Sequence, residues 1–175
     1  MVIIIVVFAP FLIIGIIFVL KIFKKIYRLY FDNQTLRKEK NLTMNKNCRF
    51  CRLSNDNSSS LYSDGDVFVI NDIHPASFFH KLVIPKEHIF NISKLHKNNC
   101  ELIKKMFLIG KTLIKQYKNQ KEYKIVFHLP ICKSVNHLHM HVIGMPFKNL
   151  WFRIIFSKLF TIDVFSLIKK LEKLN

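Results

Sequence analysis

Three histidines alternate with apolar residues near the end of the chain, between positions 137 and 143. In an extended strand successive side chains point to opposite faces, so His137, His139 and His141 share one face and the apolar residues share the other. Imidazole acts as nucleophile, proton carrier or metal ligand near neutral pH. The spacing therefore predicts a half-buried strand, residues 137–143, with a chemically active face.

Nucleophilic attack on phosphorus is the chemistry that we expect of this face. A neutral imidazole displaces a leaving group from phosphorus, and water then opens the phospho-imidazole intermediate. The chain has four glycines and no glycine-rich phosphate loop, so other donors must hold the phosphate. Lys133, Ser134 and His141 supply a charge, a hydroxyl and a ring N–H. The competing hypothesis is a metal-sequestering triad that turns all three histidines to one ion.

Three further segments occur upstream, in a fixed order. Residues 48–51 read Cys-Arg-Phe-Cys, residues 71–75 read Asn-Asp-Ile-His-Pro, and residues 80–89 form an apolar strand that ends in Pro-Lys-Glu-His-Ile. Together with the alternating histidines, these segments resemble the histidine triad superfamily over about residues 46–170. The third branch of the histidine triad nucleotide-binding proteins is most similar, because it also has a Phe-His-x-Pro loop like residues 127–130.

The resemblance implies a role for each matched histidine. His139 takes the place of the family's nucleophile, and His141 the place of a histidine that helps to hold the phosphate. His137 supports the strand or, in zinc-bearing members, binds the metal. His80 matches an upstream histidine near the phosphate and the leaving group.

The same resemblance implies a nucleotide-binding set. Asp72 matches an acidic residue that contacts the ribose hydroxyls, Ile73 an apolar contact with the base, and Ser134 a phosphate-contacting serine. Lys133 stands where the family often has glutamine, and residues 128–130 replace an Asn-Glu-Gly-type loop, so the leaving group stays open. We interpret His128 as structural.

Two cysteines spaced Cys-x-x-Cys are half of a tetrahedral zinc site. In zinc-containing relatives the other two ligands are the histidine of the Pro-Lys-x-His block and the first triad histidine, which correspond to His88 and His137. The resemblance thus allows a structural zinc on Cys48, Cys51, His88 and His137. The alternative is a pair of reduced thiols, because a cytosolic domain keeps its cysteines reduced.

Both strands and helices are predicted among the segments that must position these residues. Asp64-Gly65 predicts a hairpin turn, and a 3.6-residue apolar period predicts a long helix from Asn91 or Ser93 to about residue 117. The expected fold is α+β: an antiparallel sheet of about five strands with one long helix and a C-terminal helix. The predicted elements are a hairpin over 61–70, strands over 80–84, 124–128 and 137–143, and helices over 93–117 and 163–174.

The first 43 residues differ in composition from the rest. Residues 2–20 carry no charge and are long enough to cross a bilayer core of about 30 Å. Basic residues follow at once, which predicts a transmembrane helix with the downstream domain, residues 44–175, facing the cytosol. Alternatively, residues 1–43 are an extended gene prediction and translation starts at Met44, which predicts a cytoplasmic or nuclear protein.

The positive charge of the chain is spread along the sequence and is not gathered in one binding patch. The net charge of +17 comes from 28 basic and 11 acidic residues, and the lysines are scattered along the sequence. We therefore expect no nucleic-acid partner. We do expect a homodimer, because two such domains usually pair in the family to extend the sheet.

The sequence as a whole predicts an enzyme. We expect a hydrolase of nucleoside 5′-phosphoramidates, of the adenosine 5′-monophosphoramidase type, that works through a nucleotidyl-histidine and requires no catalytic cofactor. One alternative is a dinucleoside polyphosphate or adenylylated-substrate hydrolase. Another is a membrane-tethered nucleotide-binding protein without useful turnover.

Overall fold

The computed structural model describes residues 21, 25, 47–117, 122–132 and 135–174. The chain divides into two units, residues 1–39 and 40–175, and the elements below belong to the second. The predicted membrane anchor, residues 1–43, falls outside the described residues except for Lys21 and Lys25. Among the described residues no helix is long and apolar enough to cross a bilayer. The predicted domain boundary after residue 43 stays a prediction.

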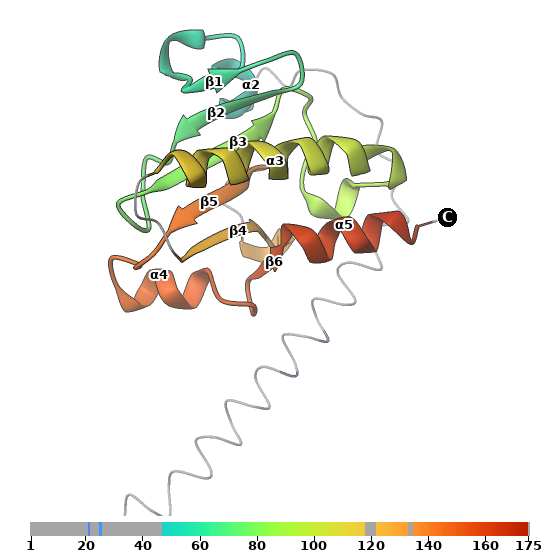
Figure 1. Ribbon diagram of the computed structural model, residues 1–175. Helices are drawn as coiled ribbons and strands as arrows, with labels where there is room; N and C mark the ends of the chain where they lie inside the picture. The colour runs from blue at the N-terminus through green and yellow to red at the C-terminus, as the bar shows by residue number, and fades with distance from the viewer. Residues whose placement is uncertain (1–20, 22–24, 26–46, 118–121, 133–134, 175) are drawn as a thin grey trace, which may run out of the picture. The chain divides into compact units, whose positions relative to one another are not determined.

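The second unit is built on a six-stranded antiparallel sheet with strand order β1-β2-β3-β5-β4-β6 (Figure 1). The predicted α+β fold is confirmed, and the structure adds one strand to the five expected. This extra strand, β6, has only three residues, too few for an alternating pattern to be visible in the sequence. The strands are β1 (Tyr62–Ser63), β2 (Val67–Asn71), β3 (His80–Pro85), β4 (Tyr123–His128), β5 (Met140–Gly144) and β6 (Thr161–Asp163).

Strand β5 lies in the middle of the sheet, between β3 and β4. Its register places His141 opposite Leu82 on one side and Val126 on the other. The predicted strand over 137–143 begins three residues late, at Met140. The reason is that the preceding residues bond elsewhere: the Leu138 N–H donates to the carbonyl of Ile89 at 2.6 Å.

One face of the sheet is covered by helix α3 (Cys100–Gln116), with α5 (Val164–Glu172) beside it (Figure 1). Helix α3 begins later than predicted, because the Asn91 side chain accepts the Ser93 N–H and caps a short 3-10 helix instead. Asp163 caps α5, accepting the Ser166 N–H at 3.0 Å, close to where the sequence placed it. The 3-10 helices are η1 (Asn57–Ser59), η2 (Ile92–Lys94), η3 (Lys97–Asn99) and η4 (Pro130–Cys132).

The opposite face carries the histidines and is packed at two places by short helices that the sequence did not predict. Helix α2 (Arg49–Leu53) buries Phe50 and Cys51 in a cluster with Phe68 and Ile84 of β2 and β3. Helix α4 (Leu150–Ile155) and the following Phe156 join a second cluster with Ala76, Val126 and Ile143. Both helices are too short for a helical period to be visible in the sequence.

Gly110 marks the closest approach of α3 to the sheet. A side chain there would put its Cβ 3.0 Å from Met140 Cε and 3.1 Å from Val142 Cγ2. We expect Gly110→Val to lower the free energy of unfolding by about 1–3 kcal/mol through overpacking. Denaturant titration measures this change. Gly65→Ala is the control, since a Cβ at Gly65 meets nothing within 4 Å, and a loss there as large as at Gly110 contradicts the packing argument.

Candidate active site

A chain of hydrogen bonds joins three residues on the histidine face. The Ala76 N–H donates to His80 Nδ1 at 3.0 Å, so His80 carries its proton on Nε2. His80 Nε2 in turn lies 2.9 Å from His141 Nδ1. The donor must be His80, and His141 therefore carries its own proton on Nε2.

That proton on His141 has no acceptor among the described residues. His141 Nε2 is one of two buried side-chain atoms in this part of the chain that lack a hydrogen-bond partner, the other being Asn91 Nδ2. Burial and three neighbouring histidines hold the pKa of His141 well below its ordinary value, so the ring is neutral. A buried N–H without a partner is costly unless a ligand accepts it. The arrangement therefore offers a donor to an anionic oxygen.

Asp72 adds a negative charge beside the two histidines. Its Oδ2 lies 3.3 Å from His80 Nε2 and 3.8 Å from His141 Nδ1, while its Oδ1 accepts the His74 N–H at 2.8 Å. Burial lowers the pKa of His80 to about 4, and the Asp72 carboxylate opposes this shift only in part. Asp72 thus faces the histidine pair, and its contact with a ribose remains a prediction.

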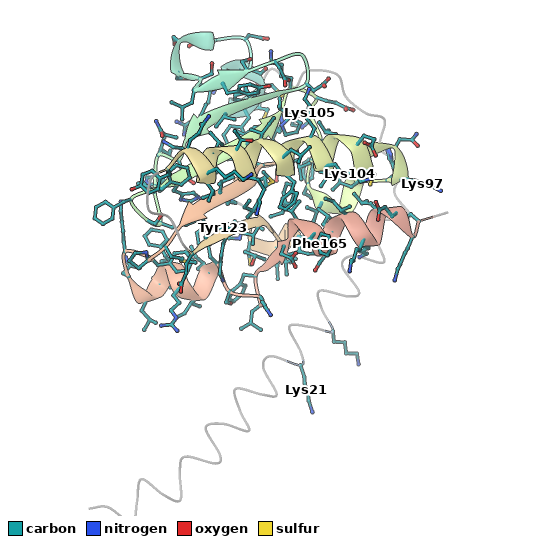
Figure 2. The ribbon with its side chains drawn as sticks, in the orientation of Figure 1. Lys21, Lys97, Lys104, Lys105, Tyr123 and Phe165 are labelled. Carbon is teal, nitrogen blue, oxygen red and sulfur yellow. The ribbon has the colours of Figure 1, made fainter. Side chains whose placement is uncertain are left out.

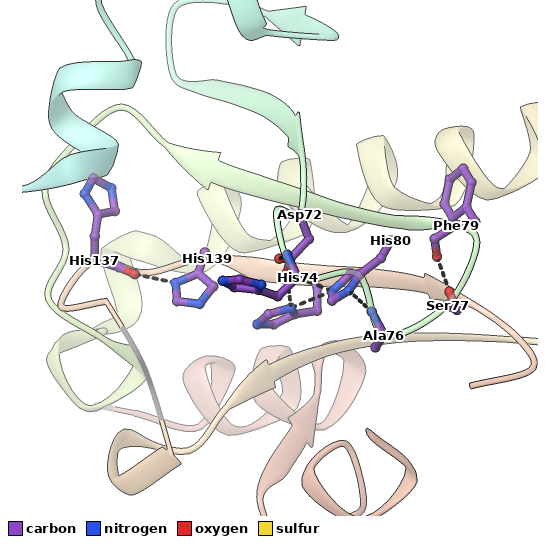
Figure 3. Close-up of polar contacts among 9 residues, drawn as sticks. Asp72, His74, Ala76, Ser77, Phe79, His80, His137 and His139 are labelled. Atoms are coloured by element: carbon purple, nitrogen blue, oxygen red, sulfur yellow. Dashed lines mark hydrogen bonds and ion pairs between the residues drawn. The ribbon is translucent and has the colours of Figure 1, made fainter. Parts of the chain in front are cut away.

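The histidine rings on this face form a row, in which His139 lies between His137 and His80 (Figure 3). Its Nδ1–H donates to the backbone carbonyl of His137 at 2.6 Å, which leaves the lone pair on Nε2. The ring lies 5.0 Å from the ring of His141 and 5.3 Å from the ring of Phe50, centroid to centroid. A neutral imidazole in this tautomer has the lone pair that a nucleophile needs.

Two residues to which the sequence gave no active role complete the cluster. The ring of His128 lies 4.8 Å from that of His141, nearly perpendicular to it. The ring of Phe156 packs against His80, His128 and His141 at 4.7–5.5 Å. The Phe-His-x-Pro motif was the available signal for His128, whereas Phe156 sits in an apolar stretch that nothing distinguishes.

A second cluster lies at the other end of the row, where His137 meets the Cys-x-x-Cys segment. His137 Nδ1 lies 3.3 Å from Cys48 Sγ, 3.5 Å from Cys51 Sγ and 3.2 Å from His88 Nδ1. His88 Nδ1 also lies 3.2 Å from Cys51 Sγ. The structure thus brings together the four ligand atoms proposed from the sequence, within 4.8 Å of one another.

These four residues fit a tetrahedral metal ion. Zinc bonds of roughly 2.0–2.3 Å to nitrogen and sulfur imply neighbouring ligand atoms roughly 3.3–3.8 Å apart, close to the separations between these side chains. His137 Nε2 donates to the carbonyl of Pro85 at 2.8 Å, so the Nδ1 lone pair is directed into the cluster. A backbone acceptor of this kind orients metal-bound histidines in general.

The remaining predicted site residues are less informative. Ile73 follows β2 with 61% of its surface exposed, beside Asp72 and available to a ligand. Lys133 and Ser134 lie outside the described residues, so their predicted phosphate contacts stay predictions.

Comparison with known proteins gives a consistent result. The family described as scavenger mRNA decapping enzyme C-term binding matches residues 47–155. Adenosine 5′-monophosphoramidase HINT3 of Xenopus tropicalis is 35% identical over 119 residues, 65% of this chain and 77% of the relative. The bifunctional adenosine 5′-phosphosulfate phosphorylase/adenylylsulfatase HINT4 of Arabidopsis thaliana is 33% identical over 112 residues, 62% of this chain and 77% of the relative.

Solved structures agree with these relatives. A HIT family hydrolase from Clostridium thermocellum has 29% sequence identity and a TM-score of 0.54, covering 58% of this chain and 93% of its own. A HIT family hydrolase from Legionella pneumophila has 26% identity and a TM-score of 0.54, covering 59% of this chain and 97% of its own.

The buried histidines make stability depend on pH. Burial lowers the pKa of His80 and of His128 from 6.5 to about 4. Between these values the unfolded chain binds more protons than the folded chain, so stability is full above pH 6.5 and falls as the pH drops towards 4. We expect His128→Gln to reduce this slope by up to about 1.4 kcal/mol per pH unit, measured by denaturant titration at several pH values.

The matched control for that measurement is His96→Gln, because His96 is exposed. Its slope should run parallel to that of the parent chain. Equal slopes for His128→Gln and the parent would show that His128 titrates alike in the folded and unfolded states.

Proposed function

The chain belongs to the histidine triad superfamily, and we propose that it hydrolyses nucleoside 5′-phosphoramidates, as an adenosine 5′-monophosphoramidase. The predicted membership is confirmed, and with it the broader prediction of a nucleotide hydrolase. The particular bond is the proposal. One observation carries it: His139, with its lone pair on Nε2, lies beside His141, whose buried Nε2–H lacks an acceptor among the described residues.

The reaction proceeds in two steps on this pair. His139 Nε2 attacks the α-phosphorus, forming a phosphorus–nitrogen bond as the bond to the leaving amine breaks, and the amine takes up a proton from the surrounding histidines or Ser134. Water then attacks the nucleotidyl-histidine and returns a proton to that donor, releasing the nucleoside monophosphate and restoring the imidazole. His141 Nε2–H donates to a phosphate oxygen in both steps. The negative charge of Asp72, which lies beside His80 and His141, favours the positive charge that the His139 ring gains on attack.

The substrate assignment rests on the residues around this pair. Ile73 is exposed beside Asp72 and suits an apolar contact with a purine, and Lys133 and Ser134 precede the triad in the sequence. Adenylylated substrates are the second candidate, because the similar protein of Arabidopsis thaliana is named as an adenylylsulfatase. Lys133 suits the additional phosphates of a dinucleoside polyphosphate.

A structural zinc ion belongs to the proposal but takes no part in the chemistry. The ion would be held by four side chains and would join α2 to the segment before β5; these are Cys48, Cys51, His88 and His137. We expect the reaction at His139 to require no catalytic cofactor.

Two further features of the proposal concern assembly. The apolar run of residues 2–20 supports a membrane anchor that leaves residues 44–175 in the cytosol. A homodimer that extends the sheet would use the outer edge of β4, where the pairing with β6 begins only at Val126.

Replacement of the nucleophile tests the reaction. We expect His139→Ala in the purified full chain to lower kcat/KM for a fluorogenic adenosine phosphoramidate by roughly 10³-fold or more. His96→Ala, an exposed histidine, should retain the parent rate. Normal turnover by His139→Ala refutes the assigned nucleophile, and tight binding of adenosine monophosphate by the parent without turnover indicates a binding protein instead. Competition with a diadenosine polyphosphate separates the two candidate substrates.

Elemental analysis of the purified chain tests the zinc ion. We expect about one zinc per chain, lost in Cys51→Ser and retained in Cys132→Ser, because Cys132 lies outside the ligand cluster. A chelator should lower the free energy of unfolding of the parent more than that of Cys51→Ser. A parent protein that contains no zinc, or whose free energy of unfolding is the same with and without the chelator, contradicts the proposal.

A further inference from the structure

Helix α4 presents an unusual surface for a helix in a folded domain. None of its residues is buried, and Leu150, Trp151 and Ile154 are exposed by 69%, 66% and 43%. The partly buried Phe152 and Ile155 pack against the cluster that contains Phe156. The helix therefore has one apolar side on the domain and further large apolar side chains facing solvent.

Positive charge surrounds these exposed side chains. Lys148 and Lys158 flank the helix and Arg153 lies within it, all three exposed and without an ion pair among the described residues. Burial lowers the pKa of Lys124, and the charges of Lys158 and Arg153 lower it further, so these three cations lie close enough to repel one another.

Six carboxylates of the described residues are engaged elsewhere in the domain. Asp64 and Asp66 pair with Lys105, and Glu101 and Glu172 with Lys104, both on α3 (Figure 2). Asp72 faces the active-site histidines and Asp163 caps α5. None of the six pairs with Lys148, Arg153 or Lys158, so the exposed apolar side chains of α4 are bordered by positive charge.

A neighbouring loop extends the apolar area. The Lys148 N–H donates to the carbonyl of Ala76 at 2.8 Å, which places the loop between β2 and β3 beside the start of α4. This loop carries Phe78, which is 88% exposed. Two segments far apart in the sequence thus bring large apolar side chains to one region of the domain.

We propose that α4 and the Phe78 loop dock on an anionic phospholipid bilayer. Exposed tryptophan and aliphatic side chains bordered by Lys and Arg characterise helices that lie in the membrane interface. Charge complementarity favours this occupant, since the basic residues lie where the anionic headgroups would be. A nucleic acid would satisfy the charges but not Leu150 and Ile154. This contact does not depend on the proposed anchor or on the proposed enzymatic reaction.

Trp151 provides a direct readout in the full chain, because it is the only tryptophan of the protein. We expect its emission to shift to shorter wavelength with vesicles that contain phosphatidylserine, and brominated lipids to quench it. Vesicles of phosphatidylcholine alone should produce neither effect. Binding through residues 2–20 would sediment the protein with either vesicle but would leave the emission of Trp151 unchanged.

Neutralising variants test the electrostatic part. We expect Arg153→Gln and Lys158→Gln each to weaken the vesicle-induced shift about fivefold in apparent Kd, and the double variant about 25-fold. Lys97→Gln is the matched control, since Lys97 is exposed at the far end of the domain from α4 (Figure 2). Leu150→Ser combined with Ile154→Ser should abolish quenching by brominated lipid.

Three results would overturn the proposal. The first is an unchanged emission of Trp151 with anionic vesicles. The second is a shift that depends on protein concentration without lipid, which assigns the surface to a second copy of the chain. The third is an equal response to heparin or an oligonucleotide, which assigns it to a nucleic-acid-like polyanion.

Discussion

The hydrogen bond between His80 and His141 determines the chemistry of the whole histidine face. It joins two central strands, β3 and β5, and it sets both tautomers because the Ala76 N–H already occupies His80 Nδ1. A reversed proton arrangement would leave the Ala76 N–H without its acceptor and place no donor at His141 Nε2. The tautomers of His80 and His141 are thus fixed by a backbone N–H in the loop between β2 and β3, a segment far in sequence from the reacting rings of His139 and His141.

His137 connects the two clusters of the site. Its ring reaches the cysteines and His88, while its backbone carbonyl accepts a hydrogen bond from His139 Nδ1–H. A shift of the His137 backbone would move the carbonyl that fixes the tautomer of His139. A rigid anchor at His137 helps to hold the attacking ring in place, which is a positioning effect rather than a chemical one.

The sequence predicted the parts of this structure that follow from local pattern. Alternation of side chains placed His141 on the sheet, and the Asp-Gly pair and the apolar period placed the first hairpin and the long helix. The family resemblance implied one zinc-ligand set, and the structure places its four members together: Cys48, Cys51, His88 and His137. The late start of β5 was not predictable, because it depends on the bond between Leu138 and Ile89, two residues that are distant in sequence. Phe156 joined the site through tertiary packing alone, whereas His128 lay in a motif that the sequence analysis had interpreted as structural.

The two outermost strands of the sheet, β1 and β6, have two and three residues. A long outer strand exposes a row of unpaired N–H and C=O groups on which another chain can add as a further strand. Strands of two or three residues are themselves short templates for this process, and the part of the β4 edge beyond β6, before Val126, is where a further strand could add. A central sheet rich in valine, isoleucine and phenylalanine thus lies behind outer strands that favour one defined place of association over fibrillar growth.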